Sequence, residues 1–269
     1  MFPSRTSSSR KQRSLSKLPL AGAVWIASDI HLGPDTPNTA RAFHAFLDKA
    51  CAQADALILC GDIFDAWIGD DFALASPPEW LVHTLDKLVH VSSTTTLWLG
   101  RGNRDFLIGH ALARRVGAQL LPDKVYLVTE YGNVLLSHGD EYCTADAGYQ
   151  RFRRIVRNPV VQKTFLALGL KLRRDIADWA RQRSMTANRY KSARIMDVEP
   201  QAIEQAFLDY DVDTMVHGHT HRPATHRHIV GGRPRQRIVL PDWDYDHSQP
   251  ARAGWLTIDR NGPVLHQQT

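Results

Sequence analysis

Seven polar residues of this sequence fall into short motifs of the kind that bind metal ions. Their side chains supply carboxylate, amide and imidazole donors, with no thiolate among them. They are Asp29, His31, Asp62, Asn103, His138, His219 and His221. Such donors suit borderline or hard divalent ions, for example Mn²⁺, Fe²⁺ or Zn²⁺. Seven donors exceed what one ion needs, so we predict two ions that share a bridging ligand.

The spacing of these donors supports the same interpretation. Asp29 and His31 lie two positions apart, and so do His219 and His221. In an extended segment this spacing places both side chains on one face. Two ions about 3.5–4 Å apart can activate a water and hold a phosphoryl oxygen. The motifs therefore indicate a site that acts on phosphoryl groups.

Short apolar runs precede the motifs and predict the strands that position them. These runs are residues 24–26, 56–59, 97–99, 134–136 and 214–216. Helical stretches at 40–54, 80–89 and 200–208 alternate with several of the runs. This alternation is typical of an α/β sandwich, in which polar residues at the carboxyl ends of strands form the site.

Length and composition point to one large catalytic domain, which we expect at residues 21–269. The chain has 269 residues, 43% hydrophobic and 23% charged, which excludes a disordered chain, a coiled coil and a fibre. No apolar run approaches the roughly 18–20 residues of a membrane span. Three widely spaced cysteines argue against a disulfide framework and favour a reducing compartment.

The charge is unevenly distributed, and its sum of +5 does not indicate a nucleic-acid partner. Residues 1–20 are rich in Ser and Arg and carry +5, so we predict a disordered basic tail there. Residues 151–194 carry +11, whereas 21–150 carry −8 and 195–269 carry −3. The body is therefore acidic and faces one strongly basic segment.

That basic segment lies within residues 150–195, which break the alternation of strands and helices. We predict a helical insertion, or cap, whose first helix is interrupted at Asn158-Pro159. Its apolar residues would also be explained by a plain helical pair that closes the core.

The ordered motifs resemble those of the calcineurin-like metallophosphoesterase family. They are Asp29/His31, Gly61-Asp62, Gly102-Asn103-Arg104-Asp105, His138 and Gly218-His219-Thr220-His221. The resemblance implies a four-layer sandwich of two mixed sheets flanked by helices. It implies one metal on Asp29, His31, Asp62 and His221. It implies a second metal on Asp62, Asn103, His138 and His219, with Asp62 as the bridge.

Residues 66–71, 102–107, 146–150, 195–198 and 217–223 resemble a narrower group, the UDP-2,3-diacylglucosamine hydrolases of Gram-negative lipid A biosynthesis. The resemblance implies hydrolysis of the pyrophosphate of this UDP-linked diacylated glucosamine, giving UMP and 2,3-diacylglucosamine 1-phosphate (lipid X). It also implies two divalent ions, for which we expect Mn²⁺, and a cytoplasmic protein peripheral on the anionic inner membrane.

The same resemblance implies roles for individual residues. Those expected in catalysis are Asp62, Asn103, Arg104 and His219. Those expected to bind substrate are Asn103, Arg104, Asp146, Ser184, Asn188, Lys191 and His219. For the insertion, it favours an acyl-chain pocket and a basic face on the membrane surface, where each Lys or Arg contributes about 1 kcal/mol.

Arg104 agrees with a pyrophosphate substrate. In the wider family this position is often a His that can protonate an alkoxide leaving group. An Arg cannot act as a general acid near neutral pH, but it can bind phosphate oxygens bidentately. A phosphate monoester leaves as a stable anion and needs little protonation, so we expect cleavage of a phosphoric anhydride.

Three alternatives remain open at this stage. A soluble nucleotide pyrophosphatase or phosphodiesterase could use the same metal core. A nuclease could use the +11 segment as a phosphate track, with binding that weakens steeply in salt. A scaffold without activity would not need all seven donors.

Some neighbouring residues receive other expectations. We expect His217 to be structural, with its side chain turned away from the donors. Asp105 either orients Arg104 or caps a turn. We assign no role to the acidic segment 242–246, which is typical of a solvated loop after a strand.

Overall fold

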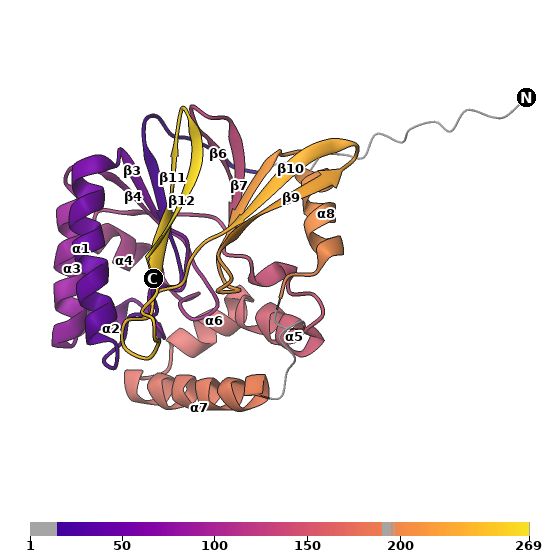
Figure 1. Cartoon of the computed structure of the whole chain (residues 1–269). Coiled ribbons are helices and arrows are strands. Elements are labelled where there is room, and N and C mark those ends of the chain that lie inside the picture. Colours follow the sequence, from indigo (N-terminus) through magenta and orange to yellow (C-terminus); the bar gives the residue numbers. More distant parts are fainter. Residues whose placement is uncertain (1–14, 190–194, 196, 269) are drawn as a thin grey trace, which may run out of the picture.

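Two mixed sheets pack face to face and carry helices on their outer faces, as predicted. A computed structural model describes residues 15–189, 195 and 197–268. Helices α1 (Pro37–Gln53) and α3 (Glu79–Ser92) cover one outer face, and α8 (Pro200–Tyr210) covers the other (Figure 1). The short helices are α2 (Asp71–Ala75), α4 (His110–Arg115) and the 3-10 turn Asp140–Tyr142.

The sheets bring the motif-bearing strands to one edge. The first sheet has the order β12 (Gly262–Gln268), β11 (Ala253–Asp259), β2 (Val24–Ala27), β3 (Ala56–Leu59), β4 (Thr96–Leu99) and β5 (Gln119–Leu120). The second has the order β1 (Lys17–Pro19), β6 (Lys124–Val128), β7 (Asn133–Ser137), β8 (Thr214–His217), β10 (Arg233–Val239) and β9 (Ala224–Val230). β2, β3 and β4 are parallel, as are β7 and β8, so the loops after them emerge together.

Three apolar layers hold the sandwich together, because neighbouring residues of a strand point to opposite faces. Trp25 and Leu57 pack in the cluster that includes the inner face of α1, whereas Ile26 packs between the sheets. In the second sheet, Leu136 packs between the sheets and Leu135 lies in the cluster with α8. Strands buried on both faces explain why the sequence showed continuous apolar runs rather than alternation.

The first described strand corrects the prediction of a disordered tail through residue 20. Lys17–Pro19 form β1 and pair in parallel with β6, and the buried Leu20 donates its backbone N–H to Val128 (2.9 Å). A three-residue edge strand that contains Lys and Pro has no pattern that sequence reasoning could detect. Residues 1–14 lie outside the described part of the chain.

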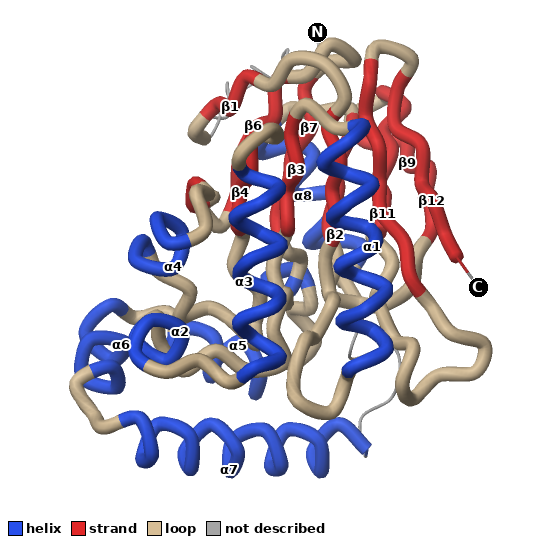
Figure 2. Tube along the Cα trace, turned by 90° about the vertical axis from the view of Figure 1, so that its left-hand side faces the viewer, coloured by secondary structure: helices blue, strands red, loops and turns tan. Residues whose placement is uncertain are grey.

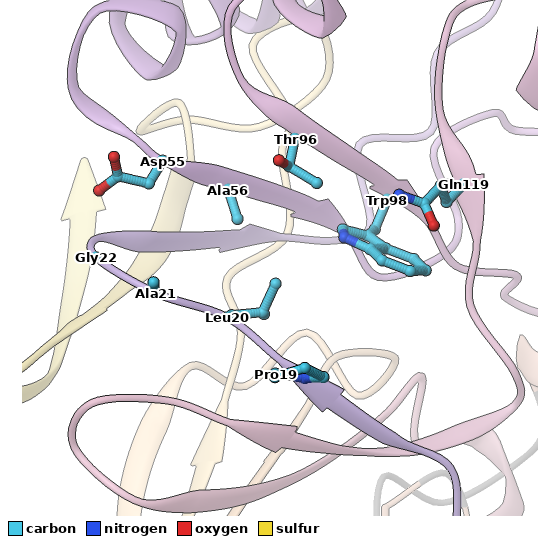
Figure 3. Close-up of a pocket in the computed structure, with 9 residues that line it drawn as sticks. All are labelled: Pro19, Leu20, Ala21, Gly22, Asp55, Ala56, Thr96, Trp98 and Gln119. Carbon is cyan, nitrogen blue, oxygen red and sulfur yellow. The ribbon is translucent and has the colours of Figure 1, made fainter.

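The insertion is helical and breaks where proline predicted. Its helices are α5 (Ala147–Val156), α6 (Pro159–Leu166) and α7 (Leu170–Arg189), and we call residues 147–189 the cap. Asn158 accepts a hydrogen bond from the backbone N–H of Val160 (2.8 Å) and so caps α6. Figure 2 shows α7 running across the base of the molecule, beyond α5 and α6. Among the helices described, none combines the length and apolar character that crossing a membrane requires.

One buried arginine anchors the long cap helix. Arg173 is 2% exposed and donates to the carbonyl of Ile68 (2.6 Å) and to the carboxylate of Asp71 (2.9 Å). Both acceptors belong to the connection that follows β3. A guanidinium buried in this way needs these partners, because an unpaired buried charge is strongly unfavourable.

Other cap arginines bind loops that carry candidate metal donors. Arg181 forms an ion pair with Asp65 after β3 (2.7 Å), and Arg157 donates to the carbonyl of Gly102 after β4 (2.9 Å). Arg153 pairs with Asp140 after β7 (2.7 Å). Together with Arg173, these arginines bind the cap to the acidic body.

We predict that Arg173→Ala loosens α7 without unfolding the sandwich. Hydrogen bonds to charged groups contribute about 1.5–3 kcal/mol each, so opening of α7 should become at least about tenfold more frequent. Hydrogen–deuterium exchange of residues 170–183, followed by mass spectrometry, measures this. Lys171→Ala, which removes an exposed charge on the same helix, is the control. Equal protection of α7 in both variants would contradict the anchoring role.

Candidate metal centre

All seven predicted donors meet at the carboxyl ends of five strands. Asp29 and His31 follow β2, Asp62 follows β3, and Asn103 follows β4. The remaining donors, His138, His219 and His221, follow β7 and β8. Neither sheet supplies a complete set, so the site exists only because the two sheets pack together.

The first ligand group is Asp29, His31 and His221, whose candidate donor atoms lie within 4.8 Å of one another. The Nε2 atoms of His31 and His221 are 3.3 Å apart. Nε2 of His221 is 3.4 Å from Oδ1 of Asp29, and Nε2 of His31 is 4.0 Å from the same oxygen. These atoms converge on one point.

The second ligand group is Asp62, Asn103, His138 and His219. Nε2 of His138 is 3.2 Å from Oδ1 of Asn103 and 3.7 Å from Oδ2 of Asp62. The rings of His138 and His219 are 5.3 Å apart. Asp29 also lies close to this group, within one cluster with Asp62 and His138.

Asp62 stands between the two groups. Its Oδ2 is 3.7 Å from His138 and 3.9 Å from His31. Its Oδ1 accepts the backbone N–H of Arg104 (2.8 Å), which fixes the orientation of the carboxylate. One oxygen therefore faces donors of both groups, which is the arrangement that a bridging carboxylate requires.

The fully buried Asp29 shows whether the donors suit a metal ion. Its Oδ2 accepts from the hydroxyl of Ser28 and from the backbone N–H of His219 (2.9 Å). Its Oδ1 has no hydrogen-bond partner among the described residues. A buried carboxylate oxygen without a partner is costly, and a cation at the convergence of the first ligand group would satisfy it. The donors present therefore fit divalent ions.

The backbone at the donors is strained. Among the described residues, six other than glycine have positive φ angles, namely Asp29, His31, Asp62, Asp211, His219 and His221. Five of these six are candidate donors. The left-handed region costs such residues about 1–2 kcal/mol, and strain of this kind concentrates at functional sites. The expectation of an extended Asp-x-His segment was therefore wrong, because left-handed turns rather than strand geometry aim these side chains.

Burial and mutual repulsion shift the acidity of the donors. Burial raises the pKa of Asp62 to about 7, and the carboxylates of Asp105 and Asp29 act in the same direction. Burial lowers the pKa of His31 to about 3 and that of His219 to about 4. For His138 burial acts downward, but the carboxylates of Asp62 and Asp29 raise its pKa to about 9. Without ions, Asp62 and His138 tend to hold protons. Binding of divalent ions should therefore release protons, and the affinity for these ions should fall in acid.

Asp105 braces the loops and does not orient Arg104. Its buried carboxylate accepts backbone N–H groups of Gly102 (2.7 Å), Ile63 (2.7 Å) and Asp62 (3.1 Å). It therefore ties the loop after β3 to the loop after β4. Of the two roles expected from sequence, the structure favours the turn-capping one.

The structure describes some of the residues predicted to bind substrate and leaves others out. Arg104 is half-buried, and its guanidinium makes no hydrogen bond or ion pair to the described part of the chain. Asp146 caps α5 by accepting the backbone N–H of Tyr149 (3.0 Å). Ser184 and Asn188 lie on α7, but their side chains are outside the described set, and Lys191 lies outside the described residues altogether.

His217 is structural, as expected. Its side chain is fully buried, its Nδ1 lies 2.8 Å from the carbonyl of Gly218, and its Nε2 lies 3.0 Å from the guanidinium of Arg237. Burial lowers its pKa to about 3, so the ring stays neutral. It supports β8 and does not join either ligand group.

Sequence reasoning missed a polar network beside His219. The buried Asp140 accepts from the hydroxyl of Tyr149 (2.6 Å) and from Nε of Arg153 (2.7 Å). The ring of Tyr149 is nearly parallel to that of His219, with centroids 6.1 Å apart. The adjacency of Asp140 to the His138 motif was the available signal, but its cap partners become visible only in the fold.

Comparison with known proteins agrees with this geometry. The calcineurin-like phosphoesterase family matches residues 22–223. A Bordetella parapertussis protein named UDP-2,3-diacylglucosamine hydrolase is 55% identical, over 92% of this chain and 96% of that protein. Proteins of the same name from Pseudomonas paraeruginosa and Serratia proteamaculans are 43% identical over 89% and 82% of this chain, and 96% and 91% of their own. With two sheets and the family's motifs at their shared edge, this chain belongs to the calcineurin-like phosphoesterase family.

Proposed function

We propose that this chain hydrolyses the pyrophosphate bond of UDP-2,3-diacylglucosamine, releasing UMP and 2,3-diacylglucosamine 1-phosphate. The observation that carries the proposal is the convergence of the candidate donors around the buried Asp62, beside Arg104, whose guanidinium has no partner among the described residues. The name shared by relatives of up to 56% identity supports this substrate.

The donors would hold two divalent ions, for which we propose Mn²⁺. The first would bind Asp29, His31, Asp62 and His221, and the second Asp62, Asn103, His138 and His219. When bound, such ions activate water and stabilise the charge that develops on a phosphoryl oxygen. Carboxylate, amide and imidazole donors are compatible with Mn²⁺ and leave Fe²⁺ and Zn²⁺ as outcomes of metal analysis.

In the proposed reaction, water adds to the phosphorus nearest uridine, and the bond from that phosphorus to the bridging oxygen breaks. The electron pair of that bond leaves with the sugar 1-phosphate, and the proton of the water goes to solvent. Asn103, Arg104 and His219 would position the phosphates. Arg104 would neutralise phosphate oxygens, because a guanidinium keeps its proton and cannot assist an alkoxide.

Exposed apolar side chains in the insertion support the proposal of a lipid substrate. Of the sixteen exposed large apolar side chains among the described residues, nine lie in the segment 150–195. Leu172, Ile176 and Trp179 are 49%, 37% and 60% exposed and follow the spacing of one helix face. We propose that the insertion at residues 150–195, which includes most of the cap, belongs to a catalytic domain at 21–269. We propose that it receives acyl chains at the cytoplasmic face of an anionic inner membrane.

The rival functions find less support. A soluble nucleotide needs no exposed apolar helix face. A nuclease would need the cap's charge free for phosphates, yet Arg153, Arg157 and Arg173 are bound to the body. We therefore expect no nucleic-acid partner.

The lipid assignment predicts strong discrimination between substrates. UDP-2,3-diacylglucosamine should turn over in the presence of Mn²⁺, and UDP-sugars without acyl chains should be at least about a hundredfold poorer by kcat/KM, since each buried CH₂ contributes about 0.8 kcal/mol. Release of UMP measures both rates, and removal of the metal with EDTA should abolish them. Equal rates on both substrates would reject the lipid assignment and leave the metal-dependent one intact.

Arg104→His should lower kcat by about 100-fold or more, the loss seen when one preorganised donor to developing charge is removed. Turnover of UDP-2,3-diacylglucosamine measures it, with Arg101→His, on the same loop, as the control. If Arg104→His retained pyrophosphatase activity, the argument for a phosphoric anhydride would fail.

The triple variant Leu172→Ser, Ile176→Ser and Trp179→Ser should raise KM for the diacylated substrate at least about tenfold, because burial of one such side chain is worth about 1.5–3 kcal/mol. Its kcat should stay near that of the unsubstituted enzyme, since these residues lie outside both ligand groups. Leu208→Ser, at an exposed apolar position on α8, is the matched control. Unchanged KM in the triple variant would contradict acyl binding by this face.

A further inference from the structure

The segment that follows β10 contacts two residues of the first ligand group. The backbone N–H of Trp243 donates to the carbonyl of Asp29 (3.0 Å), and the carboxylate of Asp242 lies 3.4 Å from Nδ1 of His221. Asp242 is 3% exposed and Trp243 is 4% exposed. The expectation of a solvated loop was therefore wrong for these two residues.

His221 thus has different neighbours on its two ring nitrogens. Its Nε2 faces Asp29 and His31 of the first ligand group, whereas its Nδ1 faces only the carboxylate of Asp242 among its close charged partners. A carboxylate close to the outer nitrogen favours the ring proton on that nitrogen. With the proton there, the inner nitrogen would keep its lone pair for an ion and would be a stronger donor.

Arg252 holds Asp242 in place. Its Nη2 lies 2.8 Å from Oδ2 of Asp242, and its Nε lies 3.3 Å from Oδ1. The backbones of Arg252 and Asp244 exchange two hydrogen bonds, of 2.8 and 3.0 Å, which anchor the arginine to the same segment. The carboxylate is therefore presented to His221 from a fixed support.

The second ligand group has a weaker outer partner. Nδ1 of His138 lies 3.2 Å from the backbone carbonyl of Cys60, which is neutral. The two groups thus differ in the charge behind one of their histidines.

We propose that Asp242 is a positioning residue that orients His221 and selectively strengthens ion binding by the first ligand group, with Arg252 as its support. The inference rests on the proposed two-metal centre and deepens it. Loss of an outer carboxylate of this kind lowers metal affinity by about 10–100-fold. The effect should fall on one ion, because Asp242 touches no donor of the second group among the described residues.

Isothermal titration of the metal-free protein with Mn²⁺ tests the proposal without any activity measurement. The unsubstituted protein should bind two ions. Asp242→Ala should weaken one by about 10–100-fold and leave the other within about twofold. Asp242→Asn, which keeps a neutral acceptor, should have a smaller effect, and Arg252→Met should act in the same direction. Asp48→Asn, which breaks an exposed pair with Lys87, should change neither ion.

The melting temperature of the metal-free variants separates positioning from folding. Selective loss at one ion with an unchanged melting temperature supports the proposal. Equal weakening of both ions together with a lower melting temperature would overturn it, because that pattern indicates a general structural role. Unchanged affinity for both ions would overturn it while the two-metal centre stands. Failure of the unsubstituted protein to bind two ions would overturn the centre and this inference together.

Discussion

Two carboxylates buried close together determine which groups the rest of the site must supply. Asp29 and Asp62 lie among four imidazoles, with little or no exposure to water. Negative charge of this kind persists in a protein interior only with positive partners and hydrogen bonds. Ser28, His219 and Arg104 supply some of these bonds through the hydroxyl of Ser28 and the backbone N–H groups of the other two. Oδ1 of Asp29 still lacks a hydrogen-bond partner among the described residues, and a divalent cation would satisfy it.

The sequence predicted the parts of this arrangement that depend on local patterns. Apolar runs such as 56–59 and 214–216 became β3 and β8 because both faces of each strand are buried, and the polar residue after each run reached the shared edge. The break at Asn158-Pro159 followed from backbone sterics alone. These features need no knowledge of distant neighbours, so one sequence suffices to infer them.

What the sequence did not reveal depends on partners far away in the chain. Asp242 belongs to a run of acids that is typical of a solvated loop, and only the fold brings it to His221 and Arg252. β1 exists because β6 offers it an open edge, not because Lys17–Pro19 favour a strand. The charge of the cap suggested an external anion, yet Arg173 is buried against the body. Arg153 and Arg181 instead pair with loops that carry the donors.

The left-handed backbone at five donors has a consequence for how the protein balances activity against robustness. Glycine adopts this conformation without strain, so His31→Gly or His221→Gly would relax the turn and remove a candidate metal donor at once. Relief of backbone strain alone would favour such changes, and selection for catalysis opposes them. The strained turns therefore lower the free energy of unfolding of the protein. Ions that bind the folded state would raise it again.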